Sequence, residues 1–258
     1  MDSNKPKLIV IAGPNGSGKT SVTTQILKHK WVEGCVYINP DNIAQERFGD
    51  WNSLEAVMDA AQYATELREN CLQKRESFIF ETVFSALEKV DFIQKAKEAD
   101  FFIRFFFVGT NHPTINASRI AHRVMEGGHD VPISKVINRY YKAINNACLI
   151  APIIDRLYVY DNSIEYAPAT LLFRANSGIL EKVYSNINEW ALPIYKVLEK
   201  EWKKAKKIGY LIDLNKLKIQ EAIDNNQKED LTVAIKVQQM LFDMRNEMLQ
   251  DLGKVVIG

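Results

Sequence analysis

The chain has 258 residues, of which 47% are hydrophobic and 25% are charged, and its formal net charge is +1. This composition is typical of a globular protein with a sizeable core, and the near-neutral balance gives no general reason to expect nucleic acid or a membrane as a partner. Cys35, Cys71 and Cys148 are too widely spaced for a disulfide framework or a zinc site. Residues 1–7 have no signal-peptide profile and no run approaches about 18 apolar residues, so we expect a cytoplasmic protein.

The first motif is a strand, a loop and the start of a helix. Leu8 to Ala12 predict a buried strand, after which the pattern G-x-x-x-x-G-K-[ST] is completely filled. Its glycines allow backbone N–H groups to point at phosphate oxygens, and the helix adds its positive N-terminal dipole. Lys19 would reach the β- and γ-phosphates, and the Thr20 hydroxyl would bind Mg²⁺. The alternative is a chance glycine-rich turn. The predicted nucleotide-binding residues are Gly13, Pro14, Asn15, Gly16, Ser17, Gly18, Lys19, Thr20 and Ser21.

Predicted helices and strands alternate after this loop. Apolar residues at three- and four-residue spacing predict helices over 21–30, 54–74, 87–99, 116–126 and 134–146. Strands are expected over 34–38, 78–80, 101–108 and 153–160, with a further one around 170–174. The apolar run 101–108 suits a parallel sheet covered on both faces, although it contains Arg104, which we expect to point out at the sheet edge. The alternation predicts a doubly wound parallel α/β sheet of the P-loop NTPase type.

The character of the sequence changes near Gly178. We divide the chain into a core of residues 1–177 and a helical region of unknown role, 178–258, in which no strand is expected. Helical segments are predicted over 180–206 and 229–252, with Pro193 kinking or splitting the first and a break at 224–227. Their apolar stripes need burial on the core or on a partner. These stripes are Ile187, Trp190, Ala191, Ile194 and Leu198, and then Val233, Val237, Leu241 and Met244.

Polar residues follow two of the predicted strands, where α/β proteins place working side chains. Asp41 is positioned to accept a proton from a hydroxyl near a γ-phosphate, or alternatively to form a turn or cap a helix. Glu81 ends a buried strand, where a carboxylate is costly unless it is paired or metal-bound; the alternative is a surface position. Thr82 and Ser85 can hydrogen-bond a substrate, but hydroxyls are also common in turns.

Three arginines form the next group. Arg119 and Arg123 are four residues apart and therefore share one helix face, and Arg139 lies on the following predicted helix. Arginine forks suit the charge that gathers on a transferring phosphoryl group. Gly127 and Gly128 would let the segment between these helices close as a lid, with His129 positioning it. The alternative is that the arginines are ordinary surface residues in salt bridges.

In order, the motifs GPNGSGKTS, INPD, FETVFS, R-x-x-x-R-V-x-x-GGHDVP with a later arginine, and YDNS resemble the zeta-toxin family of P-loop kinases over about residues 7–165. That family includes UDP-N-acetylglucosamine kinases. The resemblance implies transfer of the γ-phosphate of ATP, with Mg²⁺, to a small-molecule hydroxyl, and it makes UDP-N-acetylglucosamine the first candidate. It assigns deprotonation of the acceptor to Asp41, it places Glu81 in the acceptor site, where it helps to hold the substrate or a water bound to Mg²⁺, and it implies an antitoxin protein as a partner. The expected catalytic residues are Lys19, Asp41, Arg119, Arg123 and Arg139.

Other functions stay open at this stage. The acceptor can instead be a drug or a nucleoside, and the protein can be a nucleic-acid end kinase or an NTPase without an acceptor. The near-neutral charge weighs against nucleic acid, and the absence of an N-K-x-D motif favours ATP over a GTP-dependent switch. Asp161-Asn162-Ser163, after the last core strand, either borders the nucleotide base or forms a plain turn.

Overall fold

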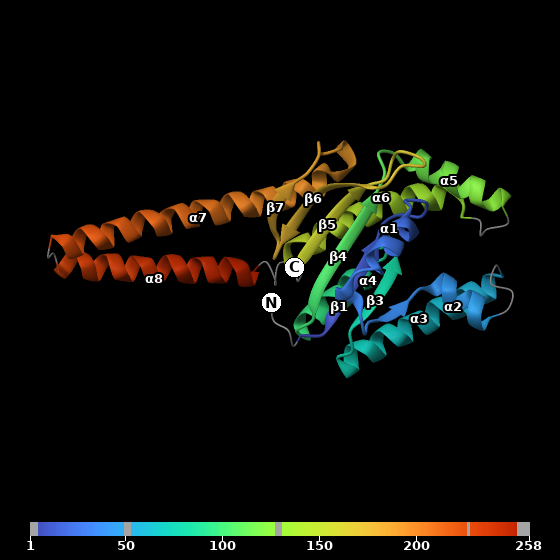
Figure 1. The fold of residues 1–258 in the computed structure, drawn as a ribbon, viewed down its shortest axis with the longest axis horizontal. Coiled ribbons are helices and arrows are strands. Elements are labelled where there is room, and N and C mark those ends of the chain that lie inside the picture. The colour runs from blue at the N-terminus through green and yellow to red at the C-terminus, as the bar shows by residue number, and fades with distance from the viewer. Residues whose placement is uncertain (1–4, 49–52, 127–130, 226–227, 252–258) are drawn as a thin grey trace.

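The computed structural model describes residues 5–48, 53–126, 131–225 and 228–251 (Figure 1). The helices and strands follow the predicted alternation, and most of the predicted elements appear within a few residues of their expected bounds. In chain order they are β1 (Lys7–Ala12), α1 (Lys19–Ile26), η1 (Lys30–Val32), β2 (Val36–Ile38), α2 (Pro40–Arg47), α3 (Leu54–Lys74), β3 (Phe78–Thr82), α4 (Leu87–Glu98), β4 (Phe102–Gly109), α5 (Pro113–Met125), α6 (Ile133–Ile150), η2 (Ala151–Ile153), β5 (Arg156–Asp161), β6 (Thr170–Asn176), β7 (Ile179–Val183), η3 (Glu189–Ala191), α7 (Leu192–Asp224) and α8 (Lys228–Asp251).

The described strands form one sheet in the order β2-β3-β1-β4-β5-β6-β7. The pairings from β2 through β5 are parallel, whereas β6 and β7 add an antiparallel pair at one edge. Alternate residues of β1 serve opposite faces: Leu8 and Val10 belong to the larger core, and Ile9 and Ile11 pack with Val22 of α1. The doubly wound parallel α/β fold is therefore confirmed, with an antiparallel extension.

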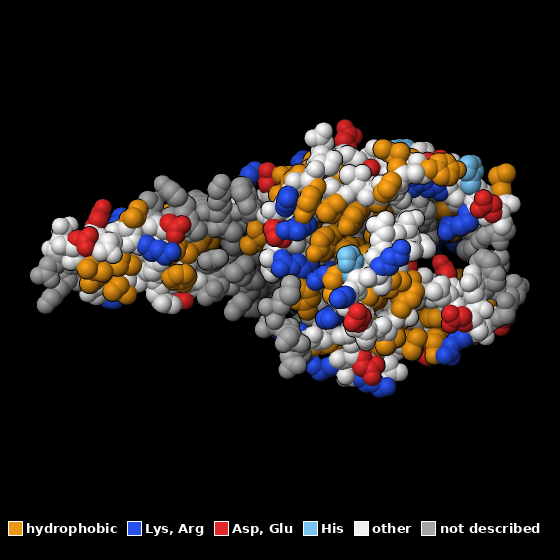
Figure 2. Space-filling model, viewed as in Figure 1, with side chains coloured by type: hydrophobic (Ala, Val, Ile, Leu, Met, Phe, Trp, Pro, Cys, Tyr) orange, Lys and Arg blue, Asp and Glu red, His pale blue; other side chains and the backbone are white. Residues whose placement is uncertain are grey.

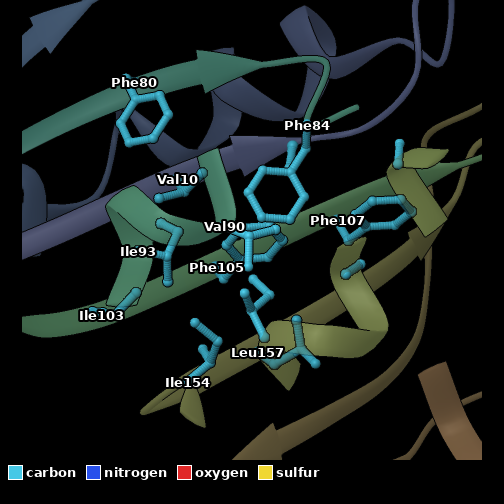
Figure 3. Close-up of a cluster of buried hydrophobic side chains, with 14 of the residues drawn as sticks. Val10, Phe80, Phe84, Val90, Ile93, Ile103, Phe105, Phe107, Ile154 and Leu157 are labelled. Atoms are coloured by element: carbon cyan, nitrogen blue, oxygen red, sulfur yellow. The ribbon is translucent and has the colours of Figure 1, made fainter. Parts of the chain in front are cut away.

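Aromatic side chains dominate the larger core, which lies between the sheet and α3, α4, α6 and the start of α7. Figure 3 shows part of it, with Phe84 and Phe105 side by side; their ring centroids are 5.0 Å apart in an edge-to-face arrangement. Full burial of such a ring stabilises the fold by about 1.5–3 kcal/mol. The core lies directly beneath the loops that follow β1 and β3, so it fixes the ends of these strands.

The expectation that Arg104 points out at a sheet edge is wrong. β4 lies in the middle of the sheet, between β1 and β5. Arg104 instead projects from the face that carries the smaller core, and its guanidinium carbon lies 4.2 Å from the centre of the Trp31 ring. The face of the Trp31 ring attracts the Arg104 guanidinium in a cation–π interaction, which stabilises the charge on that face of the sheet. Strand order depends on pairings between distant segments, which the local sequence does not display.

The expectation of no strand after Gly178 is also wrong, because β7 pairs with β6. This edge strand has only half-buried and exposed side chains, so it lacks the apolar alternation that identifies a strand. Pro193 does not kink a helix; it lies in the first turn of α7, where its missing N–H costs nothing. The boundary at residue 177 stays a prediction, and the sheet continues beyond it.

The two C-terminal apolar stripes have different environments. Trp190, Ala191, Ile194 and Leu198 are buried in the larger core, and Ile187 packs against it. In contrast, α7 and α8 continue as a helical hairpin that extends away from the sheet (Figure 1) and carries apolar side chains on its surface (Figure 2). Val233 is 61% exposed and Met244 is 51% exposed. Only the first stripe is therefore buried within the chain. None of the described helices is long and apolar enough to span a bilayer.

We predict that Trp190→Ala lowers the free energy of unfolding by about 3–5 kcal/mol, because a large buried ring is lost and a cavity remains. The control is Met240→Ala on α8, since Met240 is 63% exposed; it should change stability by less than about 0.5 kcal/mol. Denaturant unfolding of both variants measures the difference. Equal stabilities would mean that the start of the C-terminal region is not part of the core.

Candidate active site

A cavity of about 930 Å³ opens where β1, β2 and β3 end, between α2 and α3 on one side and α5 and α6 on the other. Figure 2 shows the molecule hollowed between these two sides. Most of the predicted site residues meet here. Gly13, Pro14 and Ser17 are instead buried within the phosphate loop, and Ser21 is exposed on α1. The predicted residues that line the cavity are Asn15, Gly16, Gly18, Lys19, Thr20, Asp41, Glu81, Thr82, Ser85, Arg119, Arg123 and Arg139.

The phosphate loop lies unusually close to the sheet. A Cβ atom on Gly13 would lie 2.1 Å from the Val108 carbonyl oxygen of β4, so only glycine fits. Gly18 has φ 83° and is the N-cap residue of α1, which begins at Lys19. The positive end of that helix therefore faces the cavity, as an anion site requires.

Lys19 folds back on its own loop. Its Nζ donates to the carbonyl oxygens of Gly13 at 2.9 Å and Pro14 at 3.1 Å. Burial lowers the pKa of Lys19 from 10.5 to about 8, against the opposing influence of the Glu81 and Asp41 carboxylates. The loop carbonyls hold the amine where it can turn toward a bound phosphate.

Three asparagine side chains support the loop and its neighbours. Asn116 of α5 donates to the Asn15 carbonyl at 2.6 Å, and Asn162 after β5 donates to the Ser17 carbonyl at 2.9 Å. Asn39, at the end of β2, caps α2 by accepting from the Asp41 N–H at 2.9 Å. The Asp161-Asn162-Ser163 motif thus contacts the phosphate loop. The roles of Asn39 and Asn116 as supports were not predicted, because asparagines are common in turns and at helix starts, although Asn39 lies in the INPD motif.

Asn116 is itself held by further contacts. Its Oδ1 accepts a short hydrogen bond from the Thr110 hydroxyl, and the Tyr140 hydroxyl of α6 donates to the Thr110 carbonyl at 2.5 Å. All three side chains are buried. The helices that carry the arginines are thereby joined to the phosphate loop through a satisfied polar network.

Asp41 is exposed in the cavity at the start of α2. Because Asn39 caps this helix, the alternative role of Asp41 as its N-cap is wrong. Asp41 is thus free to accept a proton from a hydroxyl in the cavity.

Glu81 is 9% exposed, so the alternative surface position is also wrong. Its Oε1 accepts from the Tyr37 hydroxyl at 2.6 Å and from Asn39 Nδ2 at 3.3 Å. Burial, together with the hydrogen bond to Glu81, raises the pKa of Tyr37 well above its ordinary value. Tyr37 lies within a predicted strand, and sequence reasoning missed its role.

The turn after β3 is strained and held in place. Phe84 has φ 59°, which is rare for a bulky residue. The Thr82 Oγ1 accepts from the Phe84 N–H at 3.1 Å, and Asn146 donates to the Phe84 carbonyl at 3.0 Å. Thr82 therefore stabilises the turn and keeps its own O–H for another acceptor, while Ser85 lines the cavity beside it.

The three arginines reach the cavity from α5 and α6. Arg119 donates to the Asn162 carbonyl at 2.9 Å, and Arg139 Nη1 lies 3.3 Å from Asn15 Oδ1. Arg123 makes no hydrogen bond or ion pair with any residue that the structure describes. Gly127, Gly128 and His129 lie outside the described residues, so the lid formed by this segment stays a prediction.

A nucleotide fits this loop chemically. Among the residues that the structure describes, the Ser17 hydroxyl is buried without a hydrogen-bond partner, and the Lys19 amine donates to loop carbonyls alone. Within the described ranges no group of three or more His, Cys, Asp or Glu side chains forms a metal cage. Mg²⁺ in phosphate sites relies on one or two protein ligands and the phosphates themselves.

The sheet order and this loop define the P-loop kinase-like class of α/β proteins. The zeta toxin family model matches residues 1–167, and the chain belongs to the zeta toxin family. An uncharacterized protein from Haemophilus influenzae is 31% identical over 134 residues, which are 52% of this chain and 92% of that protein.

Two sets of solved structures share the fold. The AvrRxo1-ORF1:-ORF2 complex matches with a TM-score of 0.54 and 19% identity over 76% of this chain, and a second structure with ATP has a TM-score of 0.53. This chain covers 65% of the matched AvrRxo1 chain, just under two thirds. The PezAT toxin–antitoxin system of Streptococcus pneumoniae matches with a TM-score of 0.50 and 16% identity, over 94% of this chain and 89% of that one.

We predict that nucleotide binding takes up a proton at alkaline pH. The free protein holds Lys19 with a pKa of about 8, and bound phosphates favour the charged amine. Proton uptake should thus be small near pH 7 and approach about one proton near pH 9. Calorimetry in buffers of different ionisation enthalpy measures it, with Lys19→Arg as the control that stays charged. Uptake that is independent of pH would contradict this assignment.

Proposed function

We propose that the protein is an ATP-dependent kinase that transfers the γ-phosphate to a hydroxyl of a small molecule, with UDP-N-acetylglucosamine as the first candidate. The observation that carries the proposal is one cavity that brings together the phosphate loop, the arginines of α5 and α6 (Arg119, Arg123 and Arg139), and the carboxylates of Asp41 and Glu81. Family membership and the ATP-containing structure of similar fold support it.

Each residue has a role in this reaction. Asp41 takes the proton of the acceptor hydroxyl as the new O–P bond forms and the bond to the ADP leaving oxygen breaks. Lys19 and the arginines stabilise the charge that develops on the phosphoryl oxygens. Glu81, oriented by Tyr37 and Asn39, binds the acceptor, and the hydroxyls of Thr82 and Ser85 contact it.

Mg²⁺ would be held by the Thr20 hydroxyl and phosphate oxygens. When bound, this ion neutralises charge on the β- and γ-phosphates. The phosphate loop, Gly13 to Ser21, binds ATP through the backbone N–H groups that are not already bonded within the protein, since Pro14 has no N–H and those of Gly13, Ser17 and Ser21 donate to protein carbonyls.

An antitoxin protein is a further part of the proposal. The matched AvrRxo1 and PezAT structures are described as a two-protein complex and as a toxin–antitoxin system. A partner that covers the cavity would block ATP. Co-expression with the product of an adjacent gene, followed by co-purification and an ATP-binding assay, tests this.

The acceptor is identified by mass spectrometry. Incubation of the protein with ATP, Mg²⁺ and a panel of sugar nucleotides, nucleosides and drugs should yield a product heavier by one phosphoryl group. ATP consumption without any such product would favour an NTPase instead.

We predict that Asp41→Asn reduces kcat by about 10²–10⁴-fold, because the amide keeps the shape and loses the proton acceptor. ATP affinity should change little. Glu46→Gln is the matched control, because Glu46 lies on the same helix and outside the cavity. A parallel collapse of ATP binding in Asp41→Asn would make this residue structural or metal-binding.

We predict that Arg123→Ala slows transfer tenfold or more without lowering Tm. A charge-assisted contact in a water-excluded site contributes about 2–4 kcal/mol to the transition state, whereas Arg123 has no partner in the described chain to lose. Lysine should rescue poorly, because it lacks the planar fork. His122→Ala on the same helix is the control. Wild-type turnover in Arg123→Ala would remove this arginine from the reaction.

A further inference from the structure

Arg68 is a buried cation that the proposed reaction does not use. It lies on α3 at 4% exposure and lines the cavity, one turn from Thr65 and two turns from Ala61, which line it as well. This spacing directs one face of α3 at the cavity. Arg68 approaches from the opposite side to the three arginines of α5 and α6.

Among the described residues Arg68 has no carboxylate partner within 4.0 Å. Its Nη2 donates to the Thr65 hydroxyl at 2.8 Å, and its guanidinium carbon lies 5.1 Å from the centre of the Phe80 ring. One neutral hydrogen bond and ring contacts leave most of its five N–H groups unused. A buried cation in that condition is costly.

The unused N–H groups face the cavity. The buried side-chain polar atoms that lack partners in the described chain are Ser17 Oγ and Arg174 Nε, and no atom of Arg68 is among them. The free nitrogens of Arg68 are therefore open to the space in the cavity. A ligand bound in that space can accept hydrogen bonds from them directly.

Charged side chains of both signs lie around Arg68. Lys89 and Glu88 line the cavity with it, and Lys89 Nζ pairs with Glu88 at 2.8 Å. Burial lowers the pKa of Arg68 against the opposing influence of the Glu88 and Glu69 carboxylates, and burial, together with the charge of Arg68, lowers the pKa of Lys89. Arg68, Lys89 and Glu88 thus give this part of the cavity lining one positive charge in excess, although Glu69 acts on Arg68 from outside the lining. Asp41 and Glu81 instead act on Lys19 of the phosphate loop.

We propose that Arg68 binds an anionic group of the phosphoryl acceptor, so that the acceptor carries a phosphate or carboxylate in addition to its reacting hydroxyl. This rests on the proposed function, because it assigns the cavity beyond Asp41 to the acceptor. The guanidinium fork suits such a group geometrically. The acceptor then lies with its hydroxyl at Asp41 and its anion at Arg68.

The test uses the full chain saturated with Mg²⁺ and a non-hydrolysable ATP analogue, so that the phosphate loop is already filled. Inorganic phosphate is titrated at constant ionic strength. We expect it to bind and to raise Tm, and Arg68→Met to weaken it tenfold or more, about 1.4 kcal/mol. Arg47→Met is the matched control. The Arg47 guanidinium carbon also lies over an aromatic ring, 4.2 Å from the centre of the Tyr63 ring, but Arg47 does not line the cavity.

A second measurement separates binding from folding. Loss of an unpaired buried charge should leave the Tm of ligand-free Arg68→Met equal to or above that of the wild type. A large fall in Tm, or equal phosphate affinity in Arg68→Met and wild type, would overturn the proposal, as would absence of phosphate binding to the wild type. Failure of the ATP analogue to bind would instead overturn the proposed kinase function.

Discussion

The close approach of the phosphate loop to the sheet is the constraint on which the rest of the site depends. Gly13 leaves no room for a side chain against Val108, and Asn116 and Asn162 hold the loop carbonyls from the segments after β4 and β5. The loop is thus fixed by its close backbone approach to β4 and by asparagine side chains from neighbouring segments, in addition to its own Lys19. A site that must bind a multiply charged ligand gains from such pre-organisation, because no loop ordering is needed on binding.

Charge is sorted along the cavity. Lys19 and three arginines line the side of the phosphate loop and α5 together with Glu126, Asp41 and Glu81 lie at the strand ends, and Arg68 and Lys89 line the side of α3 and α4 together with Glu88. Charges arranged in this way orient an acceptor that has both a hydroxyl and an anionic group. The reversed orientation would place its anionic group beside the Asp41 and Glu81 carboxylates. The lowered pKa of Lys19 reflects the same arrangement: burial opposes its charge until phosphates arrive.

The sequence predicted the fold, and it predicted most of the side chains that meet in the cavity, because both depend on local signals. A filled phosphate-loop pattern, apolar strands and polar strand ends are readable in short windows. Arg104, β7 and the supporting asparagines were misjudged or missed because their environments come from distant segments. Arg68 looks in the sequence like any arginine on a charged helix; its burial against Phe80 and Phe92 exists only once α3 has packed on β3 and α4.

The C-terminal region contributes to the site through one side chain. Trp190 packs on Gly109 and Phe107, and its Nε1 donates to Asp161 at 2.9 Å, next to the Asn162 that holds the phosphate loop. The start of this region therefore stabilises the strand ends of β4 and β5. Beyond Leu198 the same helix leaves the core and pairs with α8, where Asn215 bonds to the Ala234 carbonyl at 2.8 Å. The physical division between site support and hairpin thus lies within α7, and shortening the chain inside the hairpin preserves every core contact named above.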